Sequence, residues 1–182
     1  MSILVAYASR HGATQGIAER IARQLRAAGL EAEARPAKEV RDLAGYDAFV
    51  IGSAVYLFHW MKEATELVRR NRTFLAGRPV WLFSCGPLGT ETTDAEGHDL
   101  LDESELKEIA ELRAAVHPRD HRVFFGAFDH HMKAVGFTER FVRMMPAARA
   151  LFPDGDFRDW TAIEAWADGI AHELAPVPAS RR

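Results

Sequence analysis

The sequence predicts an α/β fold, in which a doubly wound, five-stranded parallel sheet carries helices on both faces. Short apolar stretches alternate with segments whose apolar residues recur every three or four positions, which is the pattern of strand and covering helix. The first stretch, Ile3 to Ala8, is continuously apolar, as is typical of a strand buried on both faces. The chain has 182 residues, of which 48% are apolar, so it is long enough to form one domain around a sizeable core.

Each element is expected from its own local pattern. The first helix has an apolar stripe through Ile17, Ile21 and Leu25 and ends at Gly29. In a later helix, Asp102 and Glu105 resemble a capping box. The strands are expected at 3–8, 30–35, 46–53, 79–84 and 123–128, and the other helices at 60–72, around 106–112, at 137–152 with a kink at Pro146, and at 160–174 with Asp159 as N-cap. Residues 1–175 form a single domain in this interpretation, and residues 176–182 form a flexible tail.

The composition excludes several classes of protein. The net charge of −3 and the pI near 6.2 argue against nucleic-acid binding, which needs a basic surface. The lone cysteine, Cys85, cannot form an internal disulfide, and a start without the features of a signal peptide leads us to expect a cytoplasmic protein. The eight histidines show no metal-ligand spacing, including the adjacent pair His130 and His131, so no metal site is expected.

The loop after the first strand is the first candidate site. Its residues are Ser9, Arg10, His11, Gly12, Ala13 and Thr14, and a helix follows directly. The first N–H groups of a helix have no partner within it, and together with the helix dipole they attract a phosphate. Hydroxyls from Ser9 and Thr14 add donors, and Gly12 permits a tight turn. The competing interpretation is an ordinary turn capped by Thr14, and the loop by itself does not separate the two.

Two further loops follow the third and fourth strands. The first of them places four ring-bearing side chains within five positions, where a flat aromatic ligand can stack. Tyr56 and His59 are the better ligand candidates there, while Trp60 or Phe58 is expected to begin the packing face of the next helix. The other loop is held open by two glycines and a proline, and its N–H groups can bind the polar edge of a heterocycle. The candidate residues of the two loops are Ser53, Ala54, Val55, Tyr56 and His59, and Ser84, Cys85, Gly86, Pro87, Leu88 and Gly89.

Other reaction classes lack their motifs. The first loop has no lysine after its glycine, which a nucleoside-triphosphate P-loop requires, and no G-x-G-x-x-G follows a strand. No G-x-S-x-G elbow supports a serine hydrolase, and the first loop has no cysteine to act as a phosphatase nucleophile. Cys85 has no partner for a disulfide cycle and is expected to be a small, semi-buried residue. No residue is assigned as an acid or base catalyst.

Taken together, the three loops and the order of elements resemble the flavodoxin family. The first loop is similar to that family's phosphate loop, with His11 at a position where a hydroxyl residue is more usual. Segments along nearly the whole chain are similar to one branch, the flavodoxin-like menaquinone-dependent protoporphyrinogen IX dehydrogenases. These segments are 7–14, 46–53, 125–127 and 159–160.

The resemblance implies a sheet order of 2-1-3-4-5 and a non-covalently bound FMN. The phosphate would lie on residues 9–14, and the isoalloxazine between 53–59 and 84–90. The implied activity is an FMN-dependent oxidoreductase that oxidises protoporphyrinogen IX and passes electrons to a quinone or a redox protein. Ordinary flavodoxins are strongly acidic and stack an aromatic residue from the third loop on the flavin, whereas 84–90 contains none. This difference argues against a simple electron shuttle.

Two alternatives stay open at this stage. The first is a cofactor-free domain that binds an anion or a partner on the same scaffold. The second concerns membrane contact, because the stripe of Phe137, Phe141, Met144 and Met145 is flanked by arginines at 140, 143 and 149. A basic amphipathic helix can lie on the inner face of a membrane, although a helix that covers the sheet is the favoured interpretation of the stripe. The oligomeric state is not predicted.

Overall fold

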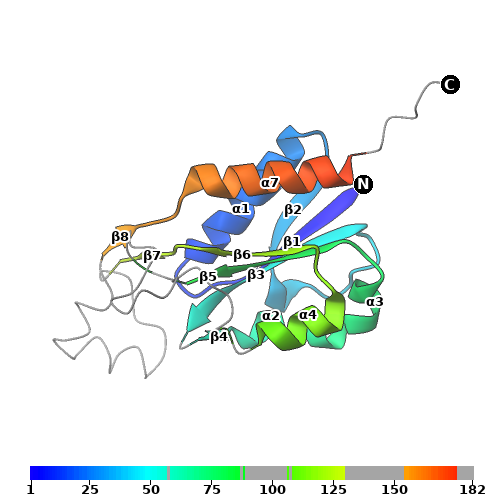
Figure 1. Ribbon diagram of the computed structural model, residues 1–182, viewed down its shortest axis with the longest axis horizontal. Helices are drawn as coiled ribbons and strands as arrows, with labels where there is room; N and C mark the ends of the chain where they lie inside the picture. The colour runs from blue at the N-terminus through cyan, green and yellow to red at the C-terminus, as the bar shows by residue number, and fades with distance from the viewer. Residues whose placement is uncertain (57, 87, 89–105, 107, 130–153, 176–182) are drawn as a thin grey trace.

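A central parallel sheet organises the molecule (Figure 1). The computed structural model describes residues 1–56, 58–86, 88, 106, 108–129 and 154–175. The five parallel strands follow the order β2-β1-β3-β5-β6, which is the predicted order once a short extra strand, β4, is counted. β4 pairs antiparallel with the end of β3. The strands are β1 (Ser2–Ala8), β2 (Glu31–Pro36), β3 (Ala48–Tyr56), β4 (His59–Trp60), β5 (Val80–Cys85) and β6 (Asp120–Phe124).

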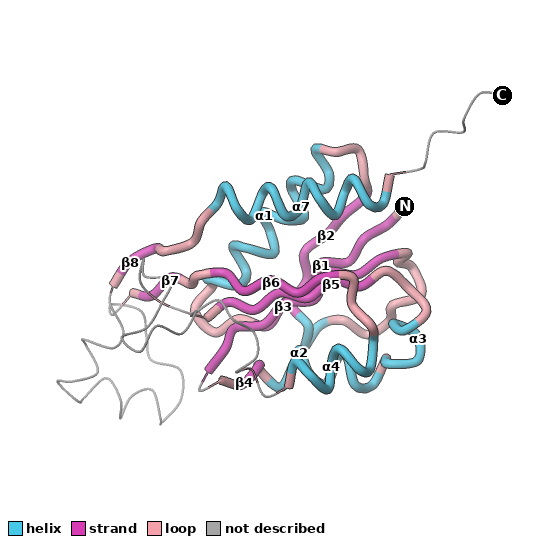
Figure 2. Tube along the Cα trace, in the orientation of Figure 1, coloured by secondary structure: helices cyan, strands magenta, loops and turns pink. Residues whose placement is uncertain are grey.

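Helices cover both faces of the sheet, as predicted (Figure 2). One layer contains α1 (Ala13–Ala27) and α7 (Trp160–Leu174). The other contains α2 (Lys62–Arg70), α3 (Arg72–Ala76) and α4 (Ile109–Val116). A 3₁₀ turn, η1 (Ala37–Glu39), follows β2, and a two-stranded hairpin of β7 (Ala127–Phe128) and β8 (Gly155–Asp156) lies near the carboxyl ends of the strands.

The alternation of side chains along β1 divides the core into two layers. Ile3, Val5 and Tyr7 pack with α1 and α7, while Leu4 and Ala6 pack with the opposite layer. A strand that is buried on both faces needs apolar side chains at every position, which is why this segment shows no polar alternation. The sheet therefore forms a rigid base whose carboxyl ends carry the connecting loops, and these ends lie at the left in Figure 1.

Several predicted elements had the wrong bounds. The fifth strand begins at Asp120 rather than Val123 and ends at Phe124, because residues beyond Gly126 pair with β8 instead of β5. Trp60 lies in β4 and not in the helix after it, and the predicted helix over 60–72 is replaced by α2 and α3. The helix around 106–112 begins at Ile109 in the described residues.

Other predictions lie outside the described residues. They include the capping box at Asp102 and Glu105, the helix at 137–152, the pair at 130 and 131, and the tail. Asp159 does cap α7, since its carboxylate accepts the N–H of Ala162 at 3.0 Å. No helix in the described part of the chain has the length and apolar composition needed to cross a lipid bilayer.

Candidate functional site

The loop between β1 and α1 forms a cup of backbone N–H groups. Gly12 has a left-handed backbone with φ of 84°, which a residue without a side chain adopts at little cost. Its carbonyl accepts the N–H of Gly16 at 2.9 Å, and its own N–H donates to Ser9 Oγ at 3.1 Å. The amides of the first helical turn precede the first intrahelical bond, so they are available to an anion.

Thr14 in this cup carries an unsatisfied hydroxyl. Its side chain is fully buried, and among the described residues Thr14 Oγ1 is the buried side-chain polar atom that lacks a hydrogen-bond partner. The competing interpretation, a turn capped by Thr14, is wrong in its cap, because the N-cap is Gly12 and no side chain caps the helix. A buried hydroxyl without a partner is costly, and such atoms concentrate where a ligand completes them.

The thiol of Cys85 is a neighbour of this hydroxyl. Burial raises the pKa of Cys85 to about 11, and the Thr14 hydroxyl opposes that rise. A thiol is a weak hydrogen-bond partner, so we treat Thr14 Oγ1 as unsatisfied. Cys85 itself lies at the end of β5 and is buried, rather than semi-buried as predicted. Its high pKa leaves it protonated, which argues against a thiolate nucleophile.

The second predicted loop is a hairpin rather than a loop. β3 continues through Ala54 and Val55 to Tyr56, and β4 returns antiparallel to it. Residues opposite each other in such a pair share a face of the hairpin. Tyr56 is opposite His59, and Val55 is opposite Trp60. Tyr56 and His59 therefore lie on one face, and Trp60, which is buried against α2 and α4, lies on the other.

Of the two aromatic residues considered for packing, Trp60 is the one that enters the core. Phe58 is 54% exposed and has a φ of 65°, an unusual conformation for a large side chain. The hairpin holds this ring out beside the site. The described part of the core does not use Phe58, so this residue is a candidate for contact with a ligand or a partner. Sequence analysis had considered Phe58, with Trp60, for packing.

Two predicted hydroxyls serve the core instead of the site. Ser53 Oγ accepts the N–H of Met61 and donates to the carbonyl of Ala54, both at 2.8 Å. Ser84 Oγ accepts the indole N–H of Trp60 at 2.7 Å and lies 2.9 Å from His121 Nε2. Both serines are fully buried within strands. Their side chains fix the hairpin to the sheet, so any contribution to a ligand comes from neighbouring backbone groups.

One contact joins two of the predicted loops, and another joins the hairpin to α4. The Arg10 guanidinium lies over the Tyr56 ring, 4.6 Å from its centre, which joins the first loop to the hairpin. His59 Nδ1 lies 2.5 Å from Glu108 Oε1 at the start of α4, and the other oxygen of Glu108 accepts the N–H of Trp60 at 3.1 Å. Glu108 was absent from the sequence-based candidates, because only the fold brings a residue so distant in the chain to the hairpin.

The third predicted segment, 84–89, leaves the end of β5 beside β6. The N–H of Gly86 donates to the carbonyl of Phe124 at 3.1 Å. A Cβ at Gly126 would lie 3.5 Å from Cys85 Sγ and 3.4 Å from Leu88, so this segment packs closely against the segment after β6. Pro87 and Gly89 lie outside the described residues.

The antiparallel pair of β7 and β8 forms a further side of the site that sequence analysis did not find. Together with His11, Gly12 and Ala13 it encloses a cavity of about 550 Å³. Arg158 anchors this side, since it donates to the carbonyl of Ala13 at 3.2 Å and to both oxygens of Asp156 at 2.7 and 2.6 Å. These hydrogen bonds lower the pKa of Asp156, even though its partial burial opposes the shift. The Arg158 guanidinium therefore links the start of α1 to β8.

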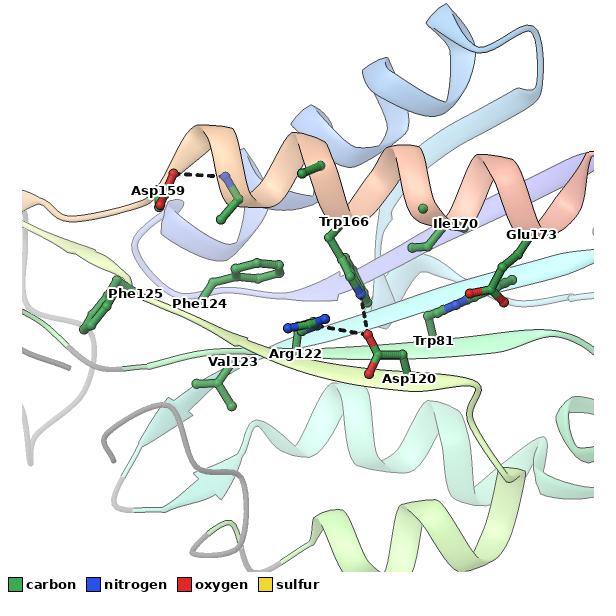
Figure 3. Close-up of a pocket in the computed structure, with 13 residues that line it drawn as sticks. Trp81, Asp120, Arg122, Val123, Phe124, Phe125, Asp159, Trp166, Ile170 and Glu173 are labelled. Atoms are coloured by element: carbon green, nitrogen blue, oxygen red, sulfur yellow. Dashed lines mark hydrogen bonds and ion pairs between the residues drawn. The ribbon is translucent and has the colours of Figure 1, made fainter. Parts of the chain in front are cut away.

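A larger cavity, of about 630 Å³, lies away from the predicted loops (Figure 3). It runs between the edge strand β6 and α7. Asp120 accepts hydrogen bonds from the Trp166 indole at 2.8 Å and from Arg122 at 3.0 Å. Arg119 pairs with Glu173 at 3.3 Å. These polar groups satisfy one another, so the cavity shows no chemistry directed at a ligand.

The described residues contain no group of three or more His, Cys, Asp or Glu side chains that could hold a metal ion. The arrangement instead has an anion cup, an aromatic hairpin and a glycine-containing turn at the same edge of the sheet. Such an arrangement suits an elongated ligand with a phosphate at one end and a planar ring at the other.

Comparisons with known proteins agree with this fold. A family model described as a flavodoxin domain matches residues 4–147. Oxidised flavodoxin 2 from Bacillus cereus superposes with a TM-score of 0.61 at 20% identity, over 96% of this chain and 100% of that one. A mutant flavodoxin from Pseudomonas aeruginosa gives a TM-score of 0.59 at 17% identity, over 96% and 99%.

A larger protein also contains the fold. Rubredoxin oxygen:oxidoreductase from Desulfovibrio gigas gives a TM-score of 0.58 at 14% identity, and the match covers 95% of this chain but 36% of that one. No match was found among curated protein sequences.

Proposed function

This chain belongs to the flavodoxin domain family, and we propose that it is a redox protein that binds FMN. The observation that carries the proposal is the buried, unpartnered hydroxyl of Thr14 at the N-terminus of α1. A phosphate dianion on the cup accepts hydrogen bonds from this hydroxyl and from the first-turn amides, and so removes the cost of leaving the hydroxyl unsatisfied. The residues present therefore fit the phosphate end of the cofactor.

We assign the isoalloxazine to the space between the β3–β4 hairpin and the end of β5. Tyr56 and His59 would offer one side of it, and the backbone of Cys85 and Gly86 the other. When bound, FMN supplies the acceptor and donor of electrons, and the protein binds and orients it. Arg10, which lies over the Tyr56 ring, would add a positive charge to this side of the site.

We further propose that the substrate is protoporphyrinogen IX and that the electrons pass to menaquinone. The sequence resemblance over nearly the whole chain supports this activity. So do the modest net charge of −3 and the absence of an aromatic residue from 84–90, which differ from a simple electron carrier. The expected turnover is FMN-dependent reduction of a menaquinone analogue by protoporphyrinogen IX.

Absorption spectra and a pair of matched glycine variants test FMN binding. Gly12 and Gly29 have φ of 84° and 85°, and a Cβ at either would meet no atom within 4 Å. Gly12→Ala and Gly29→Ala thus carry the same backbone strain, about 1 kcal/mol. The wild type and Gly29→Ala should bind FMN equally, and Gly12→Ala should bind it at least about tenfold more weakly.

The outcomes of this experiment separate the candidate functions. Wild-type protein that shows no visible flavin bands and takes up no FMN on titration contradicts the proposal. If the same protein binds inorganic phosphate and Gly12→Ala abolishes that binding, the chain is the cofactor-free anion-binding domain considered from the sequence.

Contact with a membrane or with a protein partner stays a prediction, since the basic stripe at 137–152 lies outside the described residues. Co-sedimentation with vesicles that contain anionic lipid tests it. Protein that stays in the supernatant at low salt rejects the peripheral-membrane version.

A further inference from the structure

We propose that His59 is the proton-transferring catalytic residue of this site and that Glu108 is the residue that positions it. This inference rests on the proposed binding of FMN, and it narrows the activity to substrates that lose a proton together with an electron pair. It also excludes a protein that only carries electrons, because such a protein needs no proton acceptor at its site.

The first support is the geometry of the pair. A carboxylate has only acceptors, so the 2.5 Å contact requires His59 Nδ1 to carry the proton and donate it to Glu108. A neutral imidazole with Nδ1–H presents Nε2 as a lone pair. His59 is 48% exposed, and Nε2 makes no hydrogen bond with the described part of the chain. Among the described residues, Nε2 thus has no hydrogen-bond donor that competes with a substrate.

The second support is how firmly Glu108 is held. Its side chain is 15% exposed, and its second oxygen accepts the N–H of Trp60 at 3.1 Å. Although burial opposes it, hydrogen bonds from His59 and Trp60 lower the pKa of Glu108, so the carboxylate stays charged. Trp60 is in turn tied to Ser84 at 2.7 Å. A fixed carboxylate orients the ring and stabilises the imidazolium that forms when Nε2 takes a proton.

The third support is position. His59 is opposite Tyr56 in the hairpin, and Tyr56 is in contact with Arg10 of the anion cup. His59 therefore shares a face of the hairpin with Tyr56, the residue that contacts the loop of the anion cup. The proposed function assigns the isoalloxazine to this face, so a base at His59 would meet a substrate stacked on the ring.

The step applies to a substrate whose C–H and N–H or O–H groups are joined directly or through conjugated carbon atoms. The C–H hydrogen would leave with its bonding electron pair to the bound FMN, and a double bond would form in the substrate. The N–H or O–H hydrogen leaves as a proton and bonds to Nε2 of His59. The imidazolium later releases that proton to water. The methylene C–H and pyrrole N–H groups of a porphyrinogen meet these requirements.

Stopped-flow reduction of the FMN-loaded protein tests the assignment. Protoporphyrinogen IX, which would lose a hydride and a proton, and menadiol, which would lose two O–H protons and an electron pair, are the proton-releasing donors, and dithionite is the donor of electrons alone. In protein loaded to the same FMN occupancy, His59→Gln should slow reduction by at least one of the proton-releasing donors by about 100-fold and should change the dithionite rate far less. Added imidazole should restore part of the rate in His59→Ala. The control is His172→Gln, which replaces an exposed histidine in the last turn of α7 and should behave as wild type.

Glu108 is tested without the cofactor as well. In ¹⁵N spectra of the FMN-free wild type at about pH 8, His59 should carry its proton on Nδ1. Glu108→Gln should lose this tautomer preference and slow the donor reaction about tenfold, with partial recovery in Glu108→Asp.

Three results overturn the proposal. One is an unchanged donor rate in His59→Gln, which makes the His59–Glu108 contact a structural link only. Another is an FMN-loaded wild type that neither proton-releasing donor reduces. The last is a wild type that binds no FMN. This result also contradicts the proposed function, and the lack of a flavin spectrum distinguishes it from the other two.

Discussion

Replacing Thr14 by valine should change folding stability and cofactor affinity in opposite directions. Valine keeps the shape of the side chain and removes Oγ1, the buried atom that lacks a partner in the FMN-free protein. Burying an unsatisfied hydroxyl costs about 1–3 kcal/mol, so Thr14→Val should raise the unfolding free energy of the FMN-free protein by about 1 kcal/mol. Most core substitutions destabilise, so a gain would be diagnostic.

The same substitution should weaken FMN binding. A hydrogen bond to a charged group contributes about 1.5–3 kcal/mol, which corresponds to a roughly 10- to 100-fold increase in Kd. Thr14→Ser keeps the hydroxyl and should retain most of the affinity. Urea titration of the FMN-free protein gives the first quantity, and quenching of FMN fluorescence gives the second.

Cys85→Ala serves as the control for the neighbouring thiol. If the thiol already satisfied Thr14, Cys85→Ala would lower stability further in the presence of the hydroxyl than in a Thr14→Val background. We expect the two effects to add. A Thr14→Val protein that is less stable than wild type, or that binds FMN equally well, would refute the argument from the unpaired hydroxyl.

The other predictions concern the frame around the site. Gly52→Ala should destabilise the protein by about 3 kcal/mol or more in urea titration, because its Cβ would lie 2.0 Å from the Phe83 ring; an unchanged midpoint would contradict this packing. Cys85, with its pKa raised to about 11 by burial, should resist iodoacetamide at about pH 8 until urea unfolds the chain, as followed by mass spectrometry; rapid labelling of folded protein would contradict its burial. The lowered pKa of Glu108 means that its stabilisation is present above the ordinary value of 4.5 and is lost as pH falls below it. Glu108→Gln should therefore be less stable than wild type near neutral pH, and the two midpoints should converge as the pH falls further below that value; a gap that stays constant with pH would refute the assignment.

The order of elements and the place of the loop before α1 could be predicted from the sequence, because both follow from local pattern. Continuous apolar stretches such as Ile3 to Ala8 indicate buried parallel strands whatever surrounds them. Right-handed crossovers then bring the carboxyl ends of those strands, and the loops after them, to one edge. The candidate residues Tyr56 and His59 were found for the same reason, since the end of a strand is visible in the sequence.

Only the tertiary structure decided which of these side chains are available to a ligand. Ser53 and Ser84 resemble loop hydroxyls in the sequence, yet strand pairing buries them and Met61, Trp60 and His121 take up their hydrogen-bonding capacity. Glu108 and Arg158 were invisible because each meets its partner across a large separation in the chain, 49 residues for His59 and 145 for Ala13. Local periodicity sets which segments form strands and helices, whereas the pairing of a particular charge with a particular loop depends on how those elements pack, and no short stretch of sequence contains that information.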